Sequence, residues 1–297
     1  MKIYYYRGKH PNFGDELNQW IWPKLIPNFF DNDSNTIFIG IGSVLSLSHD
    51  HSAKKIVFGS GLVTHYGNKI PNISEKEWDV FFVRGPRTAK FLNIPPEKGV
   101  GDSAILIRTL VKSASQPQPF VSFIPHWESL DSGHWQEACR LAGIHLIDPR
   151  QPVQKVIDQL LVSRLVIAEA MHGAIVADAL RIPWVPVLPL NHLHREKWLD
   201  WSEALGITLR PYRLWPSCLG EVNERFPHRA SISGVARNLL GTPLHGFLDQ
   251  AFHEIAAQRL IVLSRKDPCL SEEEKMNDAT NKMVDFIEKF TKKYRSF

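Results

Sequence analysis

The sequence of 297 residues has few cysteines, no long hydrophobic run and no large excess of charge of either sign. Its three cysteines, Cys139, Cys218 and Cys269, are odd in number and lack the spacing of metal ligands. This argues against a disulfide framework and indicates a reducing compartment. No apolar stretch approaches the ~20 residues that a membrane-spanning helix needs. The chain runs from Met1 directly into a strand pattern, with no signal peptide before it, so we expect a cytoplasmic protein.

The charges are nearly balanced, with a formal net charge of +4. This excess is too small to indicate a nucleic-acid partner, but it suits a small anionic substrate or an anionic membrane surface. Hydrophobic residues make up 43% of the chain, enough for a sizeable core. The length predicts two domains.

Short apolar runs alternate with helical patterns, which is typical of βαβ units on a mostly parallel sheet. The strands predicted for the first half are Lys2–Tyr6, Thr36–Ile41, Lys55–Phe58, Asp79–Val83 and Lys98–Gly101. Those predicted for the second half are Phe120–Ile124, Ile144–Ile147, Leu165–Ala168 and Trp184–Val187. Two prolines and no apolar period mark 113–119 as a linker. The sequence therefore predicts an α/β protein with two Rossmann-like domains, residues 1–112 and 120–265, a cleft between them, and a helical tail over 266–297.

Polar or glycine-containing segments follow the predicted strands at the point where each strand ends. In the first half these segments contain Asn12, Asp15, Gly42, Ser60, Arg84 and Asp102. Because ligands of open α/β sheets bind at the carboxyl ends of strands, several such ends in a row indicate one binding cleft. Arg84 ends a buried run, so its guanidinium either clamps an anion at the sheet edge or forms an ion pair within a loop. Asp15 and Asp102 either bind hydroxyl groups or cap the helices that follow.

The most informative segment is Glu169–Pro183, EAMHGAIVADALRIP, which follows the apolar run Arg164–Ala168. Its small residues begin a helix, so His172 and the first helical N–H groups are expected where a strand ends. A helix N-terminus favours anions, and a histidine there can hold a phosphate or donate a proton. The alternative is a structural histidine beside a tight turn.

Taken in order, four segments resemble the polysaccharide pyruvyl transferase family: Asn12–Asp15, Val83–Thr88, Gly101–Asp102 and Glu169–Gly173. The Glu169–Pro183 segment is most similar to bacterial exopolysaccharide ketal pyruvyltransferases of the succinoglycan type. The resemblance extends from the first strand to Trp201. It implies a glycosyltransferase-B-like arrangement of the two domains, phosphoenolpyruvate as donor and a sugar diol as acceptor. Many members carry an arginine two residues before the motif histidine, where this chain has Ala170.

Making a pyruvate ketal from phosphoenolpyruvate requires cations and backbone N–H groups for the donor's carboxylate and phosphate, and a group that moves protons near neutral pH. We predict that His172 and Arg84 are catalytic. Arg164, Arg181, Arg195 and Lys197 are candidates to replace the cation missing at position 170. The predicted donor-binding residues are Arg84, His172, Gly173, Arg181, Arg195 and Lys197. The predicted acceptor-binding residues are Asn12, Asp15, Gly42, Ser60 and Asp102.

Two His-x-His pairs, His49/His51 and His192/His194, lack further ligands placed around them. We expect solvated loop histidines, no required metal, and no cofactor beyond phosphoenolpyruvate as co-substrate. The tryptophans Trp198 and Trp201 either stack on a sugar ring or pack in the core.

The predicted function is therefore the transfer of pyruvate from phosphoenolpyruvate to a lipid-linked saccharide during exopolysaccharide or capsule biosynthesis. Two alternatives are a glycosyltransferase that uses a nucleotide sugar on the same two-domain frame, and a non-catalytic carbohydrate-binding relative. The tail helix is expected to pack across the two domains. Alternatively, the basic residues of Lys289–Arg295 attract it to the cytoplasmic membrane face, which a lipid-linked acceptor would require the protein to approach.

Overall fold

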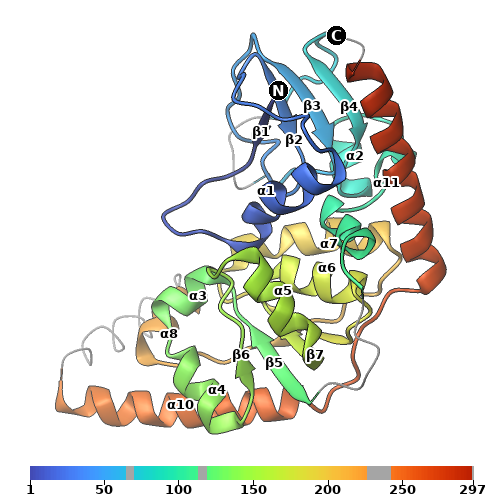
Figure 1. Ribbon diagram of the computed structural model, residues 1–297. Coiled ribbons are helices and arrows are strands. Elements are labelled where there is room, and N and C mark those ends of the chain that lie inside the picture. The colour runs from blue at the N-terminus through green and yellow to red at the C-terminus, as the bar shows by residue number, and fades with distance from the viewer. Residues whose placement is uncertain (65–69, 113–118, 226–241, 296–297) are drawn as a thin grey trace. The chain divides into compact units, whose positions relative to one another are not determined.

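The computed structural model describes residues 1–64, 70–112, 119–225 and 242–295, and it contains two parallel β-sheets flanked by helices (Figure 1). The first sheet has the order β1 (Lys2–Tyr4), β2 (Thr36–Ile39), β3 (Lys54–Phe58), β4 (Trp78–Phe82). The second has the order β6 (His145–Leu146), β5 (Phe120–Ile124), β7 (Ser163–Ala168), β8 (Trp184–Leu188), β9 (Tyr212–Arg213). Neighbouring strands pair in parallel throughout both sheets. The predicted α/β class with two Rossmann-like sheets is confirmed.

Helices separate most of the strands, but β2 and β3 follow one another with no helix between them. The α-helices are α1 (Phe13–Leu25), α2 (Pro86–Phe91), α3 (Trp127–Ser132), α4 (Trp135–Ala142), α5 (Val153–Leu161), α6 (Met171–Ala179), α7 (Glu196–Ala204), α8 (Leu219–Arg225), α10 (Pro243–Leu263) and α11 (Glu273–Tyr294). Short 3₁₀ helices are η1 (Pro96–Lys98), η2 (Ser103–Thr109) and η3 (His192–His194).

The apolar runs predict eight of these strands with boundaries within two residues of those observed. The predicted strand Lys98–Gly101 is wrong, because η1 occupies its start and an isolated bridge between Val83 and Gly99 is the pairing it makes. Pro95 and Pro96 precede it, and a proline has no N–H to donate to a sheet. The two-residue strand β9 was not predicted, since two residues are too short to show a period.

The chain divides into two compact units whose ranges differ from the predicted domains. The first unit contains Met1–Lys112, Glu196–Leu209 and Ser271–Phe297, and the second contains Ser113–Arg195 and Arg210–Leu270. Helices α7 and α11 therefore belong with the first sheet, although the sequence places them in the second domain and in a tail across both domains. The predicted linker lies outside the described residues except for Pro119.

Helix α11 packs on the first sheet through an apolar face (Figure 1). Phe290 is fully buried and its ring lies 5.4 Å from that of Phe38 and 5.5 Å from that of Phe58. Phe286 stacks on Phe82, and Lys293 pairs with Asp79 at 2.7 Å. These contacts explain why the end of the chain joins the first unit, since they remove its apolar stripe from water.

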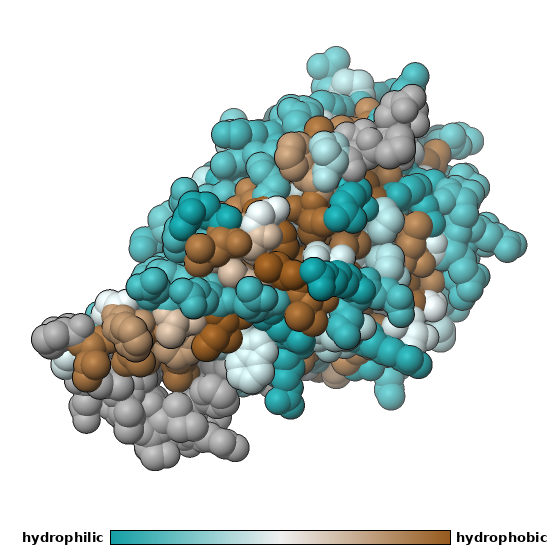
Figure 2. Space-filling model, turned by 90° about the horizontal axis from the view of Figure 1, so that it is seen from below, coloured by the Kyte–Doolittle hydropathy of each residue, from teal (hydrophilic) through white to brown (hydrophobic). Residues whose placement is uncertain are grey.

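Helix α10 keeps apolar side chains at its surface. Figure 2 looks onto this helix from below and shows hydrophobic surface along it. The large hydrophobic side chains exposed on it are those of Leu244, Phe247, Ile255 and Val262. Within the described ranges, no helix is both long enough and apolar enough to cross a bilayer.

Candidate functional site

The Glu169–Pro183 segment has the expected geometry at the carboxyl end of β7. The strand ends at Ala168, and α6 begins at Met171 with Ala170 as its N-cap residue. His172 is the second residue of the helix and is partly exposed. Because an alanine side chain cannot accept hydrogen bonds, Ala170 leaves the first N–H groups of α6 without an N-cap side chain.

Gly173 lets α6 approach the end of β5 closely. A Cβ atom at this position would lie 2.6 Å from the Ile124 side chain. This close approach is enough to explain why a glycine is needed here. Donor binding by the N–H group of Gly173 remains a prediction.

Glu169 joins three strand ends through one buried carboxylate. Its Oε2 accepts a hydrogen bond from the His126 backbone N–H after β5 (2.8 Å), and its Oε1 accepts from the Ser129 hydroxyl (2.8 Å). Oε1 also accepts from the Leu190 N–H after β8 (2.9 Å). The residue is fully buried, and burial raises its pKa to about 7 against the lowering effect of these hydrogen bonds. The carboxylate therefore fixes the loops on both sides of His172.

A cluster that the sequence did not predict lies beside Glu169, at the same edge of the second sheet. His194 Nε2 lies 2.7 Å from Glu128 Oε2, which also accepts a hydrogen bond from the Asn191 amide at 3.1 Å. The rings of His126 and His194 stack with centroids 4.0 Å apart. His194 is buried, so the expectation of a solvated loop histidine is wrong for it.

Ligand atoms of His126, Glu128 and His194 lie within 4.8 Å of one another, close enough to hold an ion. However, the short Glu128–His194 hydrogen bond and the stacking of the two rings are the arrangement of a carboxylate-oriented imidazole. The cluster therefore places a second histidine that can transfer protons at this edge.

The predicted replacement cations separate into different places. Arg195 follows β8 and donates from Nε and Nη2 to the Pro189 carbonyl (3.3 and 3.1 Å). Partial burial and the neighbouring Arg213 lower the pKa of Arg195, so two cations lie close together at the carboxyl ends of β8 and β9. Sequence reasoning missed Arg213, because the strand that it ends is too short to recognise.

Two of the other predicted cations, Arg181 and Arg164, lie away from His172 within the second unit. Arg181 follows the far end of α6, a nine-residue helix about 13 Å long, and Arg164 lies near the start of β7. Lys197 belongs to α7, in the first unit. Arg181 and Arg164 therefore lie at the opposite edge of the second sheet from His172.

Arg84 is fully buried in the first unit, in an ion pair. Its Nε donates to Asp200 Oδ2 of α7 at 3.0 Å, and its Nη1 donates to the Ser43 hydroxyl at 2.5 Å. Asp200 also accepts from the N–H and the hydroxyl of Thr88 (3.0 and 2.6 Å). This geometry is the ion-pair alternative, with no exposed surface on the guanidinium, and donor binding by Arg84 remains a prediction.

Four of the five predicted acceptor residues come together at the carboxyl edge of the first sheet. The Asn12 amide donates to Asp15 Oδ2 at 2.7 Å, and a Cβ at Gly42 would lie 3.6 Å from Asp15 Oδ1. The Ser60 hydroxyl donates to the Gly42 carbonyl at 3.0 Å. The fifth, Asp102, is fully buried and accepts from the Ala104 N–H at the start of η2, the capping alternative.

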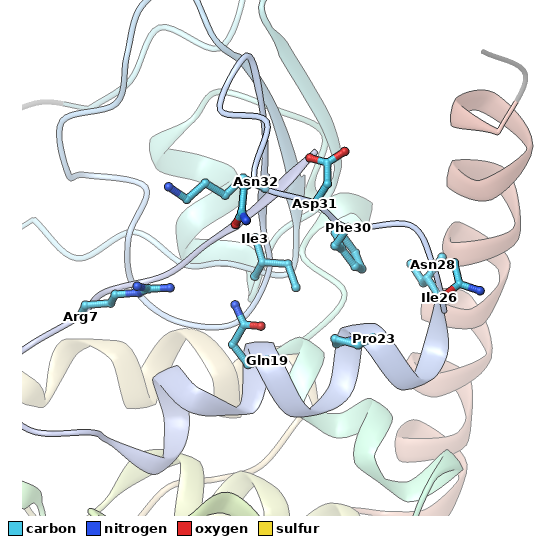
Figure 3. Close-up of a pocket in the computed structure, with 10 residues that line it drawn as sticks. Ile3, Arg7, Gln19, Pro23, Ile26, Asn28, Phe30, Asp31 and Asn32 are labelled. Carbon is cyan, nitrogen blue, oxygen red and sulfur yellow. The ribbon is translucent and has the colours of Figure 1, made fainter.

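The described residues also line two cavities. One of about 290 Å³ lies beside α1 and β1 and is lined by Ile3, Arg7, Gln19 and Pro23 among others (Figure 3). The other, of about 450 Å³, lies at the amino end of β5 and is lined by Phe120 and Arg164 among others. Neither has a predicted catalytic or acceptor residue in its lining.

The tryptophans and one histidine singled out in the sequence are wholly or partly buried. Trp198 and Trp201 are buried, with rings 6.3 Å apart, which supports core packing. His49 is partly buried between Tyr4 and Trp78, so it too is not a solvated histidine.

Comparison with known proteins identifies a relative over most of the chain. No family model and no solved structure matches the sequence. The succinoglycan biosynthesis protein ExoV of Rhizobium meliloti (strain 1021) is 41% identical over 217 residues, which cover 72% of this chain and 68% of that protein. With this identity over more than two thirds of both proteins, the chain belongs to the family of the succinoglycan biosynthesis protein ExoV.

Proposed function

We propose that the protein transfers pyruvate from phosphoenolpyruvate to a diol of a saccharide, as a ketal, in exopolysaccharide or capsule biosynthesis. The pathway rests on the similarity to ExoV, which is named for succinoglycan biosynthesis. The pyruvyl chemistry rests on the resemblance of the Glu169–Gly173 motif to pyruvyl transferases. The observation that carries the proposal is the position of His172 in the first turn of α6, at the end of β7.

The donor is an anion with a phosphate and a carboxylate, and the second unit offers groups of matching charge. The first N–H groups of α6 lie at the positive end of the helix dipole, which favours a bound anion. Arg195 and Arg213 lie together at the neighbouring strand ends. We assign the phosphate to the start of α6 and the carboxylate to Arg195, whose guanidinium offers the planar fork that a carboxylate fits.

The reaction moves two protons and breaks one carbon–oxygen bond. The methylene carbon of phosphoenolpyruvate takes up a proton, and one sugar hydroxyl adds to the central carbon and loses its own proton. Phosphate then leaves with its bridging oxygen, and the second hydroxyl adds to the same carbon. The products are the ketal and hydrogen phosphate, so the two hydroxyl protons end on the methyl group and on phosphate.

Two histidines are proposed to carry these proton transfers. His172 protonates the methylene carbon or the departing phosphate, and His194, oriented by Glu128, accepts a proton from a hydroxyl. Glu169 is a positioning residue, because it reaches the loops rather than the reacting atoms. In the first unit, Asn12, Asp15, Gly42 and Ser60 are proposed to bind acceptor hydroxyls.

The test is a comparison of donors with the full-length protein. Phosphoenolpyruvate is expected to raise the melting temperature, and UDP-glucose is expected to leave it unchanged, since a ligand of the native state stabilises by mass action. With a saccharide acceptor from the corresponding polysaccharide, phosphate release should match the formation of a product heavier by one pyruvate minus one water. Stabilisation by UDP-glucose alone, with release of UDP, would establish the glycosyltransferase alternative instead.

A further inference from the structure

A second polar cluster in the same unit lies where α4, α10 and the segment before α8 meet. His134 is the N-cap residue of α4, Cys218 precedes α8, and Asp249 and His253 lie one turn apart on α10. Ligand atoms of His134, Cys218 and Asp249 lie within 4.8 Å of one another. His134 Nδ1 faces His253 Nε2 at 2.8 Å. Three separate segments therefore bring nitrogen, sulfur and oxygen ligands to one point.

Neighbours of Cys218 hold the other members of the cluster. The Leu219 N–H donates to Asp249 Oδ1 at 2.8 Å, which leaves Oδ2 facing His134 at 3.7 Å. The Ser217 hydroxyl accepts from the His134 N–H at 2.8 Å. His245, one turn before Asp249, approaches the same Oδ2 at 3.3 Å. Groups that orient ligands in this way are typical of metal sites.

We propose that His134, Cys218, Asp249 and His253 bind a Zn²⁺ ion that ties α4 and α10 to the segment before α8. The set of two imidazoles, one thiolate and one carboxylate is the kind that zinc takes in four-coordinate sites. A thiolate ligand disfavours Mg²⁺ and Ca²⁺, which prefer oxygen. The site is structural in character, because all four coordination positions come from protein.

Zinc binding here exchanges one proton for one metal–sulfur bond. The Cys218 thiol donates to the Ser132 carbonyl at 3.3 Å. Its proton passes to solvent as the zinc–sulfur bond forms. The imidazoles bind through the lone pairs of His134 Nδ1 and His253 Nε2, so the contact between these atoms gives way to two metal–nitrogen bonds.

The experiment is a titration of the full-length, chelator-treated protein with Co²⁺ and then with Zn²⁺. Co²⁺ should produce a thiolate-to-metal charge-transfer band that saturates at one equivalent, and Zn²⁺ should displace it. Cys218→Ser should abolish the band and weaken Zn²⁺ binding by about 100-fold or more, since even changes to orienting residues cost about 10- to 100-fold. The band is specific for this site, because the His126, Glu128 and His194 cluster has no sulfur.

Cys269→Ser is the matched control, because Cys269 is also a free thiol but lies outside the cluster. It should retain the band and the affinity, and Zn²⁺ should raise the melting temperature of this variant and of the wild type but not of Cys218→Ser. A wild-type spectrum without a thiolate band at one equivalent of Co²⁺ overturns the proposal, whether or not the Cys218 variant folds. A band that persists in a folded Cys218→Ser protein overturns it as well.

Discussion

Glu169 and His172 lie three residues apart, and their side chains serve different ends. Glu169 faces inward, where it receives hydrogen bonds from two loops and a serine. His172 lies in the first turn of α6 and keeps contact with solvent. At the scale of single residues, the motif therefore combines a buried carboxylate with a partly exposed histidine.

Removal of the His172 imidazole should slow the reaction without unfolding the protein. We expect His172→Ala to lower turnover roughly 10²- to 10⁴-fold, the usual contribution of a general acid–base group. The KM for phosphoenolpyruvate should change far less, because the start of α6 and Arg195 still hold the donor. His172→Asn should be equally poor, since an amide does not exchange a proton near neutral pH.

The measurement pairs steady-state turnover with a melting curve for each variant. His192→Ala is the control, because His192 is an exposed histidine of the same unit, two residues from His194. It should leave both quantities unchanged. A folded His172→Ala protein with near-normal turnover would exclude His172 from the chemistry.

Glu169 should make stability depend on pH. Its pKa rises from 4.5 to about 7 on folding, so between these values the folded state binds more protons than the unfolded state. The free energy of unfolding therefore falls as pH increases through this window, by on the order of 3 kcal/mol. The contribution is fully present below pH 4.5 and lost above the folded-state pKa.

Glu169→Gln should flatten this dependence, because an amide does not titrate. The variant should also be less stable than the wild type at low pH, because its NH₂ group would face one of the buried groups that donate to Glu169. Urea unfolding at a series of pH values measures both effects, with Glu137→Gln on the surface of α4 as control. Parallel curves for the wild type and Glu169→Gln would show that Glu169 does not cause the dependence.

At the scale of the elements, Phe290 anchors helix α11 in the core of the first unit. Phe290 contacts the rings of Phe29, Phe38, Phe58 and Phe81, which belong to the first sheet and the segment before β2. Near the end of the helix, Lys293 forms an ion pair with Asp79 of β4. The helix is thus part of the core of the first unit.

Truncation of this anchor should be costly. We expect Phe290→Ala to lower the free energy of unfolding by about 3–5 kcal/mol, the range for a fully buried phenylalanine. Val284→Ala on the same helix should change it by less than about 0.5 kcal/mol, because Val284 is 36% exposed. Chemical denaturation of both variants measures the difference, and equal losses would mean that α11 is not docked through Phe290.

At the scale of the whole molecule, the first unit is assembled from three separate parts of the chain. Two ion pairs, one from Arg84 before α2 and one from Arg87 in α2, join the first part to α7 in the second. Arg84 and Asp200 form a buried ion pair, and Arg87 and Glu203 form an exposed one with side chains about two fifths exposed. The two pairs join the same two parts of the chain and have opposite burial, so replacing each arginine compares a buried ion pair with an exposed one.

Arg84→Ala should destabilise the protein by about 3–5 kcal/mol, because it leaves the Asp200 carboxylate buried without its partner. Arg87→Ala should cost at most about 1 kcal/mol, as exposed ion pairs do. Melting curves and the KM for phosphoenolpyruvate should be measured together. A raised KM at an unchanged melting temperature in Arg84→Ala would support the assignment of this arginine to donor binding.

The sequence alone determined the features that depend on local pattern. Apolar runs of the right length located the strands, and their alternation with helices predicted the parallel sheets. The small residues after Glu169 predicted that His172 follows a strand and begins a helix. These features depend on residues close together in the chain, so periodicity and helix-start signals are enough to find them.

Tertiary structure alone decided which distant side chains meet. Asp200 lies 116 residues from Arg84, and no local signal shows that it forms a buried ion pair with this candidate ligand clamp. The same holds for Glu128 and His194, and for Cys218 beside His134, which reach each other only after the loops fold together. A side chain's role depends on its burial and its partners, and folding brings these from distant parts of the chain.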